Sequence, residues 1–163
     1  MRKNIYGVLL LACSLSLLTG CVEGGMPADT WIIEQYSSIS DIKSYCAKLD
    51  DVVTLYLSDG ITQEVYLTGI KQLGSELADM ERVKEEVSIK PGTFTETTMA
   101  AKEGYDDIWS SLRTLINAME SDVTVLEDKD ALSYLYLAYQ EQLEIDLEKY
   151  INGYDEAAEA GGT

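Results

Sequence analysis

The chain has 163 residues, with 29 acidic and 12 basic side chains and a formal net charge of −17. A surface this acidic repels the phosphate backbone, which excludes nucleic-acid binding as a function. The sequence contains no histidine, so Ser–His and Cys–His catalysis are excluded together with the commonest transition-metal ligand.

The first twenty residues have the pattern of an export signal. Arg2 and Lys3 precede an apolar run over residues 8–18, which is interrupted only by Ser14 and Ser16. A transmembrane helix needs about twenty apolar residues, so this run is too short to span a bilayer and is typical of a signal peptide. An ordinary secretory signal and a buried N-terminal helix are the alternatives.

The apolar run ends in Leu18, Thr19, Gly20 and Cys21. In this position the four residues resemble the lipobox of bacterial lipoproteins, the substrates of signal peptidase II. The resemblance covers the targeting segment alone. It implies removal of residues 1–20, a thioether-linked diacylglycerol on Cys21, and an extracytoplasmic protein anchored by lipid in the bacterial cell membrane or envelope. Two acyl chains would hold such a protein on the membrane durably, whereas one chain is marginal.

Processing at this position would make the protein more acidic. Loss of Arg2 and Lys3 leaves 10 basic and 29 acidic side chains, a formal charge of −19. A basic protein is the partner that such a charge favours, and weak binding of a divalent cation is a further expectation. The alternative is a solvated acidic exterior without a specific partner. With Cys13 removed and Cys21 lipidated, Cys46 would be the only thiol, so no intramolecular disulfide can form.

The mature chain is predicted to be all-α: an antiparallel, up-down four-helix bundle over residues 39–153 that follows a flexible tether over 21–38. Gly24, Gly25 and Pro27 disfavour a helix in the tether, although the apolar residues 31–33 are expected to dock on the domain. Apolar residues spaced by three and four predict helices over about 40–58, 62–87, 94–120 and 128–152, joined by short connections.

Local signals place the ends of these helices. Gly60 suits the left-handed position after the first helix, and Thr93 with Glu96 has the spacing of a capping box before the third. Residues 121–127 are expected to form a loop, Asp128 to cap the fourth helix, and Gly153 to end it. Residues 154–163 lack an apolar face and are predicted to be a disordered acidic tail.

No arrangement of residues predicts catalysis, a metal site or a cofactor. A di-iron bundle needs Glu-x-x-His pairs, which the chain lacks. Asp128 and Asp130 begin like a calcium-binding EF-hand loop, but Ser133 and Tyr139 stand where Gly and Glu are required. We therefore expect a protein that is not an enzyme.

The residues expected on an interaction surface are Trp109, Tyr134, Glu144 and Glu148. Trp109 and Tyr134 fall off the main apolar seams of their helices, and exposed aromatic residues are favoured at protein interfaces. The alternative is that these aromatic residues form a second flank of a wide core. Cys46 falls within the seam of its helix, which predicts a small packing residue and not a reactive thiol.

Two functions fit these features. The first is an envelope protein-interaction module that presents an acidic helical face to a basic partner. The second is a lipoprotein that binds a small ligand or a divalent cation, either on its carboxylates or between helices near Gly69, Gly74 and the tyrosines.

Overall fold

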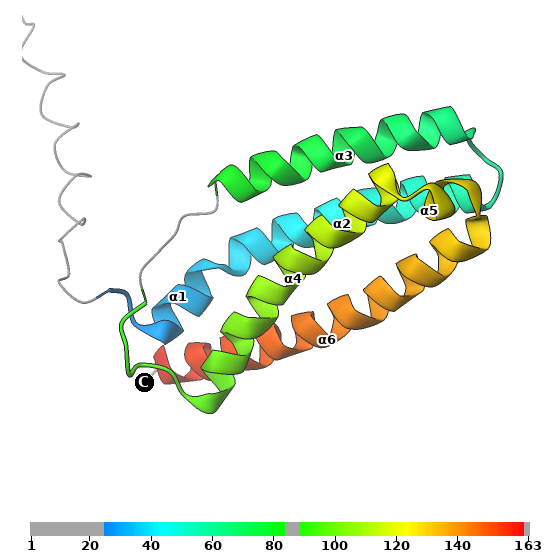
Figure 1. Ribbon diagram of the computed structural model, residues 1–163. Coiled ribbons are helices and arrows are strands. Elements are labelled where there is room, and N and C mark those ends of the chain that lie inside the picture. The colour runs from blue at the N-terminus through cyan, green and yellow to red at the C-terminus, as the bar shows by residue number, and fades with distance from the viewer. Residues whose placement is uncertain (1–24, 84–88, 162–163) are drawn as a thin grey trace, which may run out of the picture.

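The computed structural model describes residues 25–83 and 89–161 (Figure 1). This part of the chain is all-α and contains no β-strand; its one β-type contact is an isolated bridge between Met26 and Ile89. The helices are α1 (Ala28–Glu34), α2 (Tyr36–Leu57), α3 (Gln63–Val83), α4 (Glu96–Ser121), α5 (Val123–Glu127) and α6 (Lys129–Gly161).

The four long helices, α2, α3, α4 and α6, lie side by side and enclose the core (Figure 1). The expected seam of α4 is confirmed, because every one of its residues is buried: Ala101, Tyr105, Ile108, Leu112, Leu115 and Met119. The most extensive contact between two helices joins α4 and α6. These two helices therefore form the most closely packed helix pair of the described chain.

The molecule has two distinct ends (Figure 1). At the α1 end, α1 packs against α4 and α6, near the start of α4 and the end of α6. At the α5 end, α5 lies beside the C-terminus of α2, the start of α3 and the start of α6. A helix of 33 residues at 1.5 Å per residue is about 50 Å long, so α6 reaches from one end to the other.

The prediction of a flexible tether up to residue 38 is wrong for its second half. Residues 28–34 form α1, and α2 already begins at Tyr36. Trp31 and Ile32 are 5% and 0% exposed, so the expected docking of this apolar segment is confirmed. Burial of these two side chains offsets the entropy of ordering the segment, which its composition alone does not reveal.

The seam of α2 differs from the prediction at one position. Tyr45 is 1% exposed and takes the place expected for its neighbour Cys46, which is half-buried. The Tyr45 hydroxyl donates a hydrogen bond of 3.1 Å to the carbonyl of Leu73 on α3. A tyrosine can be fully buried here because its hydroxyl has this backbone partner.

The end of α2 is a Schellman motif formed one residue earlier than expected. Asp59, and not Gly60, has the positive φ of 60°. The amide of Gly60 donates to the carbonyl of Leu55 at 2.8 Å, and that of Asp59 donates to Tyr56 at 3.2 Å. These two bonds satisfy the last carbonyls of the helix, and Asp tolerates the left-handed conformation better than most side chains.

The capping box of α4 is also shifted, because Thr95 caps the helix and Thr98, not Glu96, is its partner. The Thr95 hydroxyl accepts from the Thr98 amide at 3.1 Å, and the Thr98 hydroxyl accepts from the Thr95 amide at 2.8 Å. The hydroxyl of Thr93, the expected cap, instead accepts a bond from the amide of Ala28 at 3.1 Å. Thr93 therefore fastens α1 to the segment before α4.

Two expectations about the C-terminal third are wrong, and one is confirmed. Residues 123–127 form the short helix α5 within the expected loop, and α6 continues past Gly153 to Gly161. The tail prediction fails because Ala157, 2% exposed, adds another turn to the buried face. Asp128 caps α6 as predicted, since its carboxylate accepts from the amide of Asp130 at 2.9 Å.

Gly153 lies in the helix because α4 passes too close to allow a side chain there. A Cβ on Gly153 would lie 2.4 Å from the Cβ of Ala101, and one on Gly104 would lie 2.6 Å from the carbonyl oxygen of Asp146. Small residues thus permit the close contact of α4 with α6. No helix in residues 25–83 or 89–161 is long and apolar enough to cross a membrane.

Candidate functional site

The outer side of α6 is a continuous acidic surface. At 3.6 residues per turn, ten exposed residues fall within an arc of about 100° along the whole helix. Three are apolar, six are acidic and one, Asn152, is a neutral amide. We call the nine apolar and acidic residues the acidic face: Asp130, Tyr134, Leu137, Glu141, Glu144, Ile145, Glu148, Asp155 and Glu159.

Packing on the opposite side of α6 determines which way this surface points. Leu132, Tyr136, Tyr139, Leu143 and Tyr150 are buried against the rest of the molecule. The acidic face lies on the other side of the helix from these residues and therefore faces solvent.

The apolar members of the acidic face are strongly exposed. Tyr134 is 76% exposed, and Leu137 and Ile145 are 53% and 51% exposed. Monomeric proteins tolerate single exposed apolar residues, but three on one charged helix surface have the composition of a protein interface, where aromatic and apolar anchors lie within a polar rim.

The carboxylates of the acidic face have no cationic partner among the described residues. The ion pairs in that part of the chain lie elsewhere. The two basic residues of α6 lie outside the arc: Lys129 pairs with Asp59 at 2.6 Å, and Lys149 pairs with Asp146 at 2.9 Å. The negative charge of the face is therefore not neutralised internally.

Asp146 is the one carboxylate that α6 buries, at 0% exposure. It accepts bonds from Lys149 at 2.9 Å and from Gln142 at 3.0 Å. The hydrogen bond to Asp146 raises the pKa of Lys149, and the negative charges of Asp146, Asp107 and Glu103 act in the same direction. Asp146 and Lys149 therefore form an ion pair at the contact of α6 with α4, and neither residue belongs to the acidic face.

Three of the four residues expected on the interaction surface lie together on the acidic face, namely Tyr134, Glu144 and Glu148. The expectation for Trp109 is wrong, because it is 6% exposed and packs edge-on against Tyr105 with ring centroids 6.2 Å apart. The buried stripe of α4 is wider than one heptad seam and includes Trp109. The other six residues of the acidic face were not predicted, although a helical arc drawn from Tyr134 includes them: Asp130, Leu137, Glu141, Ile145, Asp155 and Glu159. The lipobox residues Leu18, Thr19, Gly20 and Cys21 lie outside the described residues.

Cys46 is a half-buried free thiol. Its Sγ lies 3.7 Å from the hydroxyl oxygen of Tyr139. Burial raises the pKa of the Cys46 thiol, which lowers the fraction of reactive thiolate. These features agree with a packing role and provide no nucleophile.

A groove of about 780 Å³ lies between α3 and α4. Gly74 lines it beside Glu120, whose carboxylate occupies the space of the missing side chain: a Cβ on Gly74 would lie 2.6 Å from Oε1. Arg113 and Glu81 form an ion pair in the same lining. Gly69 instead approaches Val52 of α2, and neither Gly69 nor a tyrosine lines the groove.

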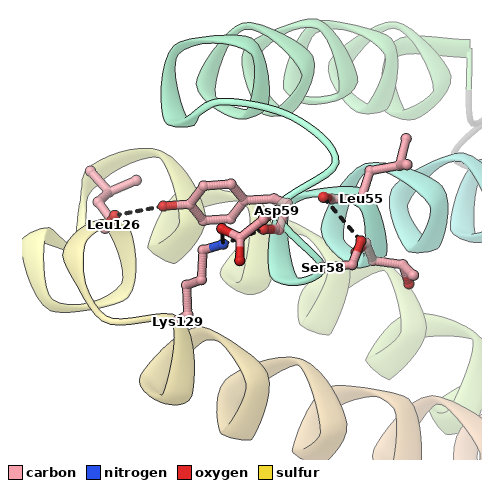
Figure 2. Close-up of polar contacts among 7 residues, drawn as sticks. Leu55, Ser58, Asp59, Leu126 and Lys129 are labelled. Atoms are coloured by element: carbon pink, nitrogen blue, oxygen red, sulfur yellow. Dashed lines mark hydrogen bonds and ion pairs between the residues drawn. The ribbon is translucent and has the colours of Figure 1, made fainter.

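Polar contacts hold the α5 end together. Lys129 donates to Asp59 at 2.6 Å and to the carbonyl of Tyr56, also at 2.6 Å, and these bonds join the start of α6 to the end of α2 (Figure 2). Tyr56 in turn donates to the carbonyl of Leu126 in α5 at 3.4 Å. Residues 25–83 and 89–161 include no group of three or more carboxylate or thiol side chains arranged to hold a metal ion.

No family model, curated protein or solved structure matches.

Proposed function

We propose that this protein is a membrane-anchored, extracytoplasmic lipoprotein without catalytic activity, which binds a basic partner protein through the acidic face of α6. The observation that carries the proposal is the combination on that face of three exposed apolar residues with six carboxylates that have no cationic partner in the described chain. Its anchor is the lipid expected on Cys21.

Charge and shape support a protein partner. The formal charge of −19 after processing steers a basic partner toward the molecule and raises the association rate. Tyr134, Leu137 and Ile145 supply apolar contact once the surfaces meet. A face about 45 Å long offers a binding surface without a cavity.

In this proposal the four long helices form an antiparallel, up-down four-helix bundle that serves as a rigid support. The support for this topology is the short chain between α2 and α3 and between α4 and α6, because short connections favour antiparallel neighbours. The acidic face would then be held straight along one edge of the bundle.

Photocrosslinking in living cells tests the partner. A photoreactive residue in place of Tyr134 should capture one dominant neighbour, whereas the same residue in place of Val65 on α3 should not. Val65 is a matched control, because it is also apolar and 53% exposed. Equal capture from both positions, or from neither, would contradict the proposal.

The contribution of charge to binding is tested with the partner that the crosslinking identifies. The double variant Glu144→Gln with Glu148→Gln should bind several-fold more weakly, and raising the salt from about 0.1 M to about 1 M should have a similar effect, because the Debye length falls from about 10 Å to about 3 Å. Asp41→Asn with Asp51→Asn, two exposed acids on α2, is the matched control and should bind normally. Binding that ignores both salt and charge would remove the electrostatic part of the proposal.

A small-ligand lipoprotein is the second candidate, and the groove between α3 and α4 is the observation that favours it. Its lining carries both signs of charge, from Lys71, Arg113, Glu81 and Glu120, which suits a zwitterionic solute better than a metal cation. Melting curves of the protein with amino acids and divalent cations would test it, since a ligand that binds the folded state raises the Tm.

A further inference from the structure

The chain is fixed to the α1 end from Met26 onward. The carbonyl of Met26 accepts a bond of 2.7 Å from the amide of Lys90. The carbonyl of Ile32 accepts one of 2.6 Å from the hydroxyl of Tyr150, and Gln35 accepts one of 2.9 Å from the hydroxyl of Tyr105. Because α4 and α6 supply these last two donors, α1 is part of the folded domain.

The position of this fixed point limits how far the domain can lie from a lipid on Cys21. Only four residues lie between Cys21 and Met26, which makes five Cα–Cα steps. A fully extended chain spans at most about 3.6 Å per residue, so the α1 end cannot lie more than about 18 Å from the anchored residue. The α5 end lies about 50 Å farther along the molecule.

The α1 end also exposes apolar side chains. Ile33 is 40% exposed, Tyr36 is 46% exposed, and Met99 at the start of α4 is 50% exposed. Ile33 and Tyr36 are three residues apart across the junction of α1 and α2, and Tyr36 is supported by Tyr154 at a centroid distance of 4.6 Å. Tyrosine has an apolar ring and a polar hydroxyl, which favours the boundary between lipid and water.

We infer that the α1 end rests on the bilayer surface, with Ile33, Tyr36 and Met99 in contact with the lipid interface and the α5 end directed away from it. This inference rests on the lipid anchor of the proposed function. The bilayer that the α1 end contacts has zwitterionic headgroups. Glu34, Glu96 and Asp155 are exposed at the same end and would repel anionic headgroups. The N-terminal part of the acidic face, with Tyr134, would then lie far from the membrane and open to a partner.

Site-directed labelling of the lipidated protein tests the orientation. In the processed protein with Cys46→Ala no thiol remains, so one cysteine can be placed at a chosen site and labelled with a fluorophore. The purified protein is inserted into phosphatidylcholine vesicles that contain a lipid with a nitroxide headgroup. Labels at Ile33→Cys and Met99→Cys should be quenched several-fold more than labels at Leu55→Cys and Val65→Cys, which are equally exposed near the α5 end.

A second pair of variants tests the apolar contact itself. Ile33→Ser with Met99→Ser should reduce the quenching of a label at Tyr36→Cys, whereas Leu55→Ser with Val65→Ser should not. Replacing part of the phosphatidylcholine with phosphatidylglycerol at low salt should also reduce it, because the α1 end is acidic. Circular dichroism of each variant confirms that it is folded.

The outcomes separate this inference from the proposed function. If mass spectrometry finds no lipid on Cys21, the anchor fails, and the inference fails with it. If the lipid is present and labels at both ends are quenched equally, the inference is wrong and the anchor stands. Selective quenching at the α1 end that the serine pair abolishes would support the inference.

Discussion

The two ends of the molecule use buried tyrosines differently. At the α1 end, Tyr150 is fully buried and its hydroxyl donates to a backbone carbonyl at 2.6 Å. At the α5 end, Tyr66 is also 0% exposed, but its hydroxyl has no hydrogen-bond partner among the described residues. Tyr66 stacks on Tyr56 with ring centroids 4.3 Å apart.

The hydrogen bonds of its buried tyrosines hold the α1 end in a fixed geometry. A buried hydroxyl with a partner stabilises one arrangement of the chain, whereas an unpartnered one costs about 1–3 kcal/mol of desolvation. The α1 end, which fastens the segment that leads to the expected anchor, has its two buried tyrosines Tyr105 and Tyr150 hydrogen-bonded. At the α5 end, Tyr56 donates a longer bond of 3.4 Å to the carbonyl of Leu126, and Lys129 supplies the shorter bonds.

Alkaline pH should have the largest effect, because it acts on both ends together. Burial raises the pKa of six tyrosines, namely Tyr45, Tyr66, Tyr105, Tyr136, Tyr139 and Tyr150. The folded state holds these protons more tightly than the unfolded state, so their contribution to stability is complete below pH 10 and is lost as the pH rises.

The loss grows as the pH rises above 10 and adds up over the six tyrosines, so we expect it to exceed the effect of any single substitution. The absorbance of tyrosinate and the circular dichroism should therefore change together between about pH 10 and 12. Ionisation of these tyrosines at pH 10 with the helices intact would contradict the assigned burial.

Adding a Cβ at the contact of α4 with α6 should have the next largest effect on stability. Gly153→Ala places a Cβ 2.4 Å from Ala101, and overpacking against a neighbouring helix should exceed the gain in helix propensity, for a net loss of about 2 kcal/mol. Gly69→Ala is the control, because its nearest neighbour is a methyl carbon of Val52 at 3.3 Å, almost 1 Å farther away than Ala101 is from Gly153. Thermal unfolding should show a Tm lower by roughly 5–10 °C for the first variant and nearly unchanged for the second.

Removing single tyrosine hydroxyls measures how much each contributes to stability at the two ends. Tyr150→Phe leaves the carbonyl of Ile32 buried without its bond and should cost about 1–2 kcal/mol, whereas Tyr66→Phe removes an unpartnered group and should be neutral or stabilising. Urea unfolding of the two variants gives both values. Equal losses would mean that the two ends do not differ.

We expect the smallest losses of stability when one lysine at each end is replaced. Lys129 lies 4.7 Å from the centroid of Tyr56 and also binds its carbonyl, whereas Lys102 lies 5.8 Å from the centroid of Trp31 and pairs with Asp106. Lys129→Met should cost about 1 kcal/mol, and Lys102→Met should cost about 0.5 kcal/mol or less, as exposed pairs usually do. A larger loss for Lys102→Met in urea unfolding would reverse this assignment.

Most of the helical fold was predictable because the apolar spacing of three and four persists over long stretches, as in α4. The predictions from sequence fail where a tertiary contact overrides the local preference of the residues. Gly153 is a helix terminator in sequence terms, but the close approach of Ala101 makes it a packing residue. Residues 28–34 look like a linker, and only burial of Trp31 and Ile32 shows why they are helical.

The interaction surface was predictable in part. Charge and spacing identified Tyr134, Glu144 and Glu148, since an exposed face of a helix keeps its periodicity in the sequence. Trp109 was misplaced because the periodicity of α4 does not reveal that neighbouring helices cover both flanks of its seam. Gly74 was a sequence signal for the groove, but Gly69 and the tyrosines expected beside it do not line it, because the groove depends on how α3 and α4 meet.

The intact mass of the protein extracted from bacterial membranes is the decisive measurement for the proposed lipid anchor. We expect a chain that begins at Cys21, lacks residues 1–20 and carries the added mass of a diacylglyceryl group, and a Cys21→Ala variant that is not lipidated. A chain that retains residues 1–20, or one that is cleaved without any lipid, would contradict it.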